Sequence, residues 1–151
     1  MKRDSKRRQK ILIVDDNAEV VEILQLALRQ AGFAVATASD GLTALKRARI
    51  SQPDLVLLDL VLPELDGFSV CETLRRDRAT ANIPIIMLTG LSSELNRYAG
   101  LDCGANDYLA KPVDLPRLLG RIRTLLEVAR ETPVPSGPAA VNPPAPTSGP
   151  A

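Results

Sequence analysis

Short aliphatic runs, several of which end in a polar side chain, alternate with amphipathic segments through the middle of this chain. The clearest runs are ILIV at 11–14, DLVLLD at 54–59 and IPIIMLT at 83–89. Continuous apolar runs of this length are typical of strands buried on both faces, as in parallel sheets. The segments 33–38 and 106–110 are weaker strand candidates. We therefore expect five strands.

Between the strand candidates the apolar residues recur with helical spacing. The clearest helix carries an apolar stripe from Leu115 to Ala129, with Asp114 placed as its cap and Pro116 in its first turn. Five strand–helix repeats with short connections predict an α/β fold, because right-handed crossovers place helices on both faces of a parallel sheet. We expect a flavodoxin-like, doubly wound sheet with strand order 2-1-3-4-5 and five helices.

The composition changes at both ends of the chain. Residues 1–10 carry six basic side chains against one acidic one, and residues 132–151 hold seven of the twelve prolines and no charge. We expect a basic disordered arm at 1–10, one folded domain at 11–131 and a Pro-rich disordered tail or linker at 132–151.

Several classes of function are excluded or disfavoured by residues that are missing or badly spaced. The chain has no histidine, which excludes histidine catalysis and histidine metal sites. Cys71 and Cys103 lack metal-ligand spacing, so we interpret them as small buried hydrophobic residues. The sequence has neither an apolar run of membrane-spanning length nor a signal peptide, and we expect a cytoplasmic protein without membrane contact.

Polar residues follow the predicted strands where the carboxyl ends of a parallel sheet meet. They are Asp15, Asp16, Asp59, Thr89 and Lys111. Each aspartate alone is explained as a helix cap, a role that Asn17 can also fill. Together the five residues supply a nucleophile, a hydroxyl, an ammonium group and three carboxylates suited to a hard cation such as Mg²⁺. The combination predicts a site that binds a phosphoryl group on a carboxylate.

Four motifs resemble the receiver domain of bacterial two-component response regulators, including the stand-alone chemotaxis type. They are ILIVDD (11–16), DLVLLDLVLPELDG (54–67), IPIIMLTG (83–90) and GANDYLAKP (104–112), and the match runs from 11 to about 126. The resemblance implies that Asp59 accepts the phosphoryl group, that Asp16 and Asp59 ligate Mg²⁺ directly, and that Asp15 does so through water. It also implies that the backbone carbonyl of Val61 is a ligand and that Lys111 neutralises the phosphoryl oxygens.

The same resemblance implies a switch made of Thr89 and Tyr108. Phosphorylation would draw the Thr89 hydroxyl towards the phosphoryl group, and the Tyr108 ring would move into the vacated space. This would change the surface formed by the fourth helix, fifth strand and fifth helix. Gly90 matches the small residue beside the phosphoryl group, and a cis Lys111–Pro112 bond would direct the lysine inwards.

The implied partners are a sensor histidine kinase or histidine phosphotransfer protein and an unidentified downstream protein, with a homodimer through the changed surface left open. The chain would be a signalling phosphoprotein that catalyses only its own phosphorylation and dephosphorylation. An aspartyl-phosphate phosphatase would need an acid where Val61 stands, and a flavin carrier would need a phosphate loop after the first strand. A non-phosphorylated interaction domain and an N-terminal fragment of a larger regulator remain alternatives. Only the 1–10 arm suggests nucleic-acid binding, which we do not expect.

Overall fold

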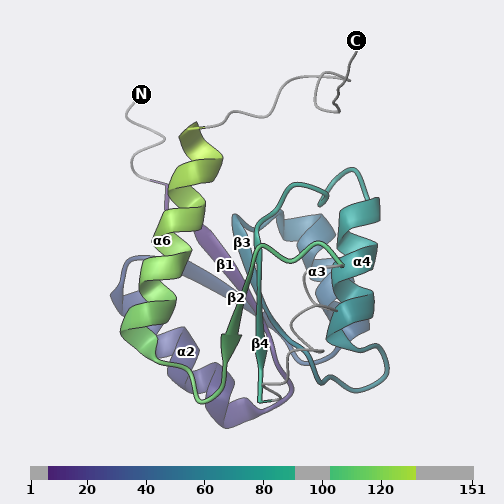
Figure 1. Ribbon diagram of the computed structural model, residues 1–151, viewed down its shortest axis with the longest axis horizontal. Helices are drawn as coiled ribbons and strands as arrows, with labels where there is room; N and C mark the ends of the chain where they lie inside the picture. Colours follow the sequence, from purple (N-terminus) through teal and green to yellow (C-terminus); the bar gives the residue numbers. More distant parts are fainter. Residues whose placement is uncertain (1–6, 91–102, 132–151) are drawn as a thin grey trace.

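The computed structural model describes residues 7–90 and 103–131 (Figure 1). Five parallel strands form one sheet in the order β2-β1-β3-β4-β5, which confirms the predicted topology. In chain order the elements are β1 (Lys10–Val14), α2 (Ala18–Gln30), β2 (Ala34–Ala38), α3 (Gly41–Ser51), β3 (Leu55–Asp59), α4 (Gly67–Arg76), β4 (Ile85–Thr89), β5 (Asp107–Ala110) and α6 (Leu115–Glu131).

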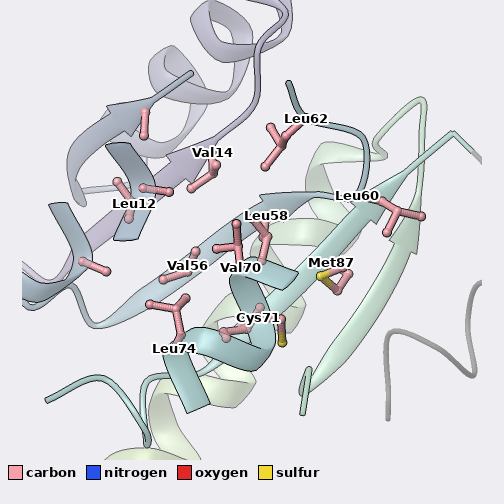
Figure 2. Packing of buried hydrophobic residues seen from close by; sticks show 14 of the residues in the cluster. Leu12, Val14, Val56, Leu58, Leu60, Leu62, Val70, Cys71, Leu74 and Met87 are labelled. Carbon is pink, nitrogen blue, oxygen red and sulfur yellow. The ribbon is translucent and has the colours of Figure 1, made fainter. Parts of the chain in front are cut away.

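Helices cover both faces of the sheet, with α2 and α6 on one side and α3 and α4 on the other (Figure 1). Because side chains alternate between the faces of a strand, each central strand supplies both layers. In β3, Leu55 and Leu57 pack towards α2 and α6, whereas Val56 and Leu58 pack towards α3 and α4. Every residue of β3 and β4 is buried, which explains why these strands are apolar up to their last residues, Asp59 and Thr89. Figure 2 shows the layer beneath α4.

The loops at the carboxyl ends of the strands are fixed by helix caps. The Asn17 side chain accepts hydrogen bonds from the amides of Glu19 and Val20, at 3.0 and 3.3 Å, and so caps α2. Asp114 lies at the start of α6 and accepts there from the amide of Arg117, at 3.4 Å. Asn17 therefore fills the role that would otherwise have explained Asp15 or Asp16 as a helix cap.

Two expectations fall partly or wholly outside the described residues. Four helices are described, and the predicted helix between β4 and β5 falls in 91–102. The arm and the tail lie outside as well, apart from residues 7–10; β1 begins at Lys10, whose amide donates to Asp54 Oδ2 at 2.7 Å. Across the described part of the chain, no helix combines the length and the apolar character needed to cross a membrane.

Candidate functional site

Three carboxylates gather at the carboxyl edge of the sheet. Asp15 and Asp16 follow β1 directly, and Asp59 is the last residue of the neighbouring strand β3. One oxygen from each carboxylate lies within 4.8 Å of the others. Asp15 and Asp59 are buried and Asp16 is exposed, so the cluster reaches from the sheet edge to solvent. The three aspartates predicted to converge are thus brought together.

Lys111 enters this cluster from the loop after β5. Its Nζ lies 2.7 Å from Asp15 Oδ2 and 3.3 Å from Asp59 Oδ2. Its backbone amide donates to the Thr89 carbonyl at 2.7 Å, and the Lys111–Pro112 peptide bond is cis. Burial lowers the pKa of Lys111, but the hydrogen bond to Asp15 and the two negative charges outweigh it, and the pKa is raised. The ammonium group therefore stays charged.

Asp59 is held at both carboxylate oxygens. The Val61 amide donates to Oδ1 at 3.3 Å, while Lys111 approaches Oδ2. Burial is the main cause that raises the pKa of Asp59, and the charge of Asp15 adds to it, while Lys111 acts in the opposite direction. Attraction to Lys111 therefore does not fully offset burial and like-charge repulsion in this cluster.

The donor set fits a hard divalent cation. It consists of oxygen ligands only, which Mg²⁺ prefers. Three carboxylates and one ammonium group leave a net charge of −2, which a divalent ion would neutralise. Asp15, Asp16 and Asp59 are therefore the side chains that would hold such an ion, and Val61 lies two residues beyond Asp59 with its side chain 60% exposed.

The backbone of Asp59 is set by a close approach of α4. Gly67 begins this helix, and its amide donates to the Leu60 carbonyl at 2.9 Å. A Cβ on Gly67 would lie 2.4 Å from the Asp59 carbonyl oxygen, closer than any real contact. The packing of Gly67 against Asp59 depends on tertiary geometry that no local sequence pattern records.

Thr89 and Tyr108 lie on neighbouring strands. Thr89 is fully buried at the end of β4, one residue beyond Leu88, which pairs with Asp59. Tyr108 pairs with Met87, two residues before Thr89, so both side chains belong to the same face of the sheet. This is the arrangement that the predicted switch requires; the movement itself stays a prediction.

A cleft of about 620 Å³ opens beside the carboxylates, between α2, α3 and the end of β2. Asp15 and Asp16 form one end of it, and its walls include Glu22, Gln25 and Arg47. Arg47 is fixed there, since its guanidinium donates to the Thr37 carbonyl at 2.7 Å. Sequence patterns did not single out Arg47, whose position follows from how α3 packs on β2. The cleft gives solvent and partners access to the exposed Asp16.

Comparison with known proteins places these features in a family. Residues 11–123 match the model of the response regulator receiver domain. The chain is 46% identical over 117 residues to the DNA-binding dual master transcriptional regulator RpaA of Synechocystis sp., covering 78% of this chain and 48% of that protein. It is 43% identical over 118 residues to the alkaline phosphatase synthesis transcriptional regulatory protein PhoP of Bacillus subtilis, covering 78% and 48%. The chain thus spans about half the length of these curated relatives.

Solved structures agree with the sequence comparison. The receiver domain of the sensor histidine kinase PA1611 from Pseudomonas aeruginosa, described with a magnesium ion coordinated in its active site cleft, superimposes with a TM-score of 0.75 at 33% identity. This match covers 80% of our chain and 99% of that one. A CheY-like receiver domain protein from Methanospirillum hungatei gives a TM-score of 0.78 at 29% identity, covering 83% and 98%.

Proposed function

The chain belongs to the receiver domain family of two-component response regulators, and from this premise we propose that it accepts a phosphoryl group on Asp59 from a phosphohistidine donor. The observation that carries the proposal is the Asp59 carboxylate, which is held by Lys111 and the Val61 amide beside Asp15 and Asp16. Among the described residues, this is the one place where a buried nucleophilic carboxylate, an ammonium group and an oxygen-only cation site meet.

The chain's own groups position the reaction. An Asp59 oxygen attacks the phosphorus, and the bond from phosphorus to the donor's leaving group breaks. Lys111 neutralises negative charge that builds on the phosphoryl oxygens, and the Val61 amide fixes the orientation of the carboxylate. Asp16, Asp59 and the Val61 carbonyl are the proposed direct Mg²⁺ ligands, and Asp15 would act through water. The ion, when bound, would stabilise charge on the transferring group. The domain would catalyse only its own phosphorylation and dephosphorylation.

The proposed donor is a sensor histidine kinase or a histidine phosphotransfer protein in the cytoplasm. Its phosphohistidine must reach Asp59 past Asp16 and the neighbouring cleft. The outer surface of α2 borders this cleft and carries two exposed apolar side chains, Ile23 and Leu26, which are 58% and 61% exposed. An apolar helix face beside the entrance is suited to a helical partner.

A second candidate concerns the output. The curated relatives are described as transcriptional regulators, and this chain matches about half of their length. We propose that the receiver controls either a separate downstream protein or an output domain of that kind. Both would read the β5–α6 surface, where Arg121 and Asp107 form an ion pair between strand and helix.

Uptake of phosphoryl from a small donor tests the proposed function. Full-length protein incubated with acetyl phosphate should gain the mass of one phosphoryl group when Mg²⁺ is present and none with EDTA. The Asp59→Asn variant should gain none under either condition, whereas the matched change Asp54→Asn, at the opposite edge of the sheet, should behave like wild type. Full incorporation in Asp59→Asn would overturn the assignment.

A further inference from the structure

Two cysteines lie side by side in the layer beneath α4, away from the carboxylate cluster. Cys71 is on α4 and points into this layer (Figure 2), and Cys103 belongs to the segment that leads into β5. The Cys71 thiol donates to the Cys103 carbonyl with Sγ 3.4 Å from the oxygen, and the same thiol lies within reach of the Cys103 sulfur. Neither of these two cysteines is in a disulfide. The two sulfur atoms are therefore within hydrogen-bonding reach of each other.

Arg75 fixes the two cysteine-bearing segments against each other. It lies one turn after Cys71 on α4, and its Nε donates to the Gly104 carbonyl at 2.9 Å. Its Nη2 donates to Asn106 Oδ1 at 2.7 Å, an oxygen that also accepts from the Ile85 amide. Gly104 has a φ of +102°, and a Cβ there would lie 2.8 Å from Arg75 Cγ. Cys103 is thus held against α4 by its neighbours.

The two sulfurs differ in environment. Cys71 is fully buried, while Cys103 keeps 7% of its surface exposed. The hydrogen bond from Cys71, together with one from the Ala105 amide, lowers the pKa of the Cys103 thiol although burial opposes it. The same hydrogen bond and burial raise the pKa of Cys71. Cys103, whose thiol pKa is lowered and which is the less deeply buried residue, therefore loses its proton more readily than Cys71.

We propose that Cys71 and Cys103 are a peroxide-sensitive thiol pair that closes an intramolecular disulfide. The Cys103 thiolate attacks one oxygen of hydrogen peroxide, the O–O bond breaks, and the departing hydroxide takes up a proton to form water. The resulting sulfenic acid on Cys103 is then attacked by the Cys71 sulfur, which forms the S–S bond and releases a second water. The two sulfurs lose two electrons in total, and the peroxide gains them.

The disulfide would join α4 covalently to the segment that enters β5. Tyr108 follows Cys103 by five residues on this strand, and Lys111 by eight. Oxidation would therefore restrain the part of the domain that carries the proposed switch and the site lysine. Disulfides of proteins in reducing compartments are usually transient and sensing. The inference does not depend on phosphorylation of Asp59.

Peptide mapping of peroxide-treated protein tests the proposal. Reduced full-length chain is treated with hydrogen peroxide, blocked with an alkylating reagent and digested with trypsin without reductant. We expect peptides 50–75 and 98–117 to be joined, with the loss of two hydrogens, and separated again by dithiothreitol. Peptides are analysed rather than the intact mass, because the two methionines also take up oxygen. Alkylated, unlinked cysteines, or links only between chains, would overturn the proposal.

Two single variants test which sulfur reacts first. In Cys71→Ser the reaction should stop at a sulfenic acid on Cys103, which dimedone traps. In Cys103→Ser, Cys71 should stay unmodified because it is buried and its proton is retained. Dimedone on Cys71 in Cys103→Ser, at a rate equal to that on Cys103 in Cys71→Ser, would contradict the assigned order. The wild-type mapping decides the disulfide itself even if either variant fails to fold.

Discussion

At the scale of single residues, the negative charge of Asp59 is only partly compensated by Lys111. Asp59 is 5% exposed, its neighbour Asp15 carries the same charge, and Lys111 lies closer to Asp15 than to Asp59. In the cation-free domain, such a cluster lowers the free energy of unfolding. The same groups serve to bind a cation or a phosphoryl group. Local destabilisation at a functional site is therefore expected here.

Asp59→Asn should stabilise the cation-free domain at neutral pH. Because the folded pKa of Asp59 is raised, its ionised form disfavours folding above that pKa, and the penalty vanishes below the unfolded value of about 3.9. We expect the variant to gain about 1 kcal/mol at pH 7 and to lose this advantage as the pH falls towards 4. Urea unfolding in EDTA across this pH range measures it. An unchanged or lower stability at pH 7 would contradict the charge balance described here.

Val61 should slow the loss of phosphoryl from Asp59. Its amide binds Asp59 Oδ1, and its side chain is exposed beside the site but cannot orient an attacking water. We expect Val61→Asn to shorten the half-life of the phosphoprotein by severalfold, whereas Val61→Leu should leave it nearly unchanged. Decay after removal of acetyl phosphate, followed by intact mass, measures both. Equal half-lives in all three proteins would show that this side chain does not control hydrolysis. Leu91, two residues after Thr89, is also apolar and lies outside the described residues.

At the scale of elements, much of the site was predictable from the sequence because strand ends are marked by local patterns. Asp15, Asp16 and Asp59 each follow an apolar run, and a parallel sheet necessarily brings those ends to one edge. The contacts made by Gly67, Arg75 and Arg47 were not predictable. Each depends on how a helix approaches a distant segment, and neither periodicity nor capping signals record that approach.

Because α4 approaches Asp59 closely, any side chain at position 67 should destabilise the domain. Gly67→Ala would place a Cβ 2.4 Å from the Asp59 carbonyl oxygen, so the strand end or the helix must shift. We expect a loss of about 1–3 kcal/mol, typical of overpacking, and weaker phosphorylation. Gly120→Ala is the matched control, since a Cβ there meets nothing within 4 Å; it should stabilise α6 by up to about 1 kcal/mol. Thermal unfolding of both variants measures these changes in stability. Equal changes in the two variants would refute a steric clash between a Cβ at position 67 and Asp59.

At the scale of the whole molecule, the architecture was predictable because a sheet buried on both faces and the helices that cover it each have a characteristic hydrophobic pattern. Continuous apolar runs indicate strands covered on both sides, and amphipathic segments between them indicate the covering helices. The strand order 2-1-3-4-5 is the usual arrangement for five such repeats, and the structure confirms it. The predicted helix between β4 and β5 lies outside the described residues, and so does most of the arm and all of the tail, so those predictions stand as made.

Cation binding should stabilise the entire domain. An ion that binds only the folded protein adds RT ln(1 + [L]/Kd) to the unfolding free energy, about 2.7 kcal/mol at a hundredfold excess over Kd. We expect Mg²⁺ to raise Tm in a concentration-dependent way and EDTA to reverse it. Asp16→Asn should abolish the shift, while Asp66→Asn, at the cap of α4, should retain it. A Tm that does not respond to millimolar Mg²⁺ would argue against a cation site at these carboxylates.

Locating the phosphoryl group on the chain tests directly whether Asp59 is the residue that accepts it. Protein phosphorylated by acetyl phosphate with Mg²⁺ is reduced with borohydride, which converts an aspartyl phosphate to homoserine, and is then digested and sequenced by mass spectrometry. We expect homoserine at position 59 and at no other aspartate. Homoserine at Asp15 or Asp16, or at a carboxylate outside the cluster while Asp59 stays intact, would contradict it.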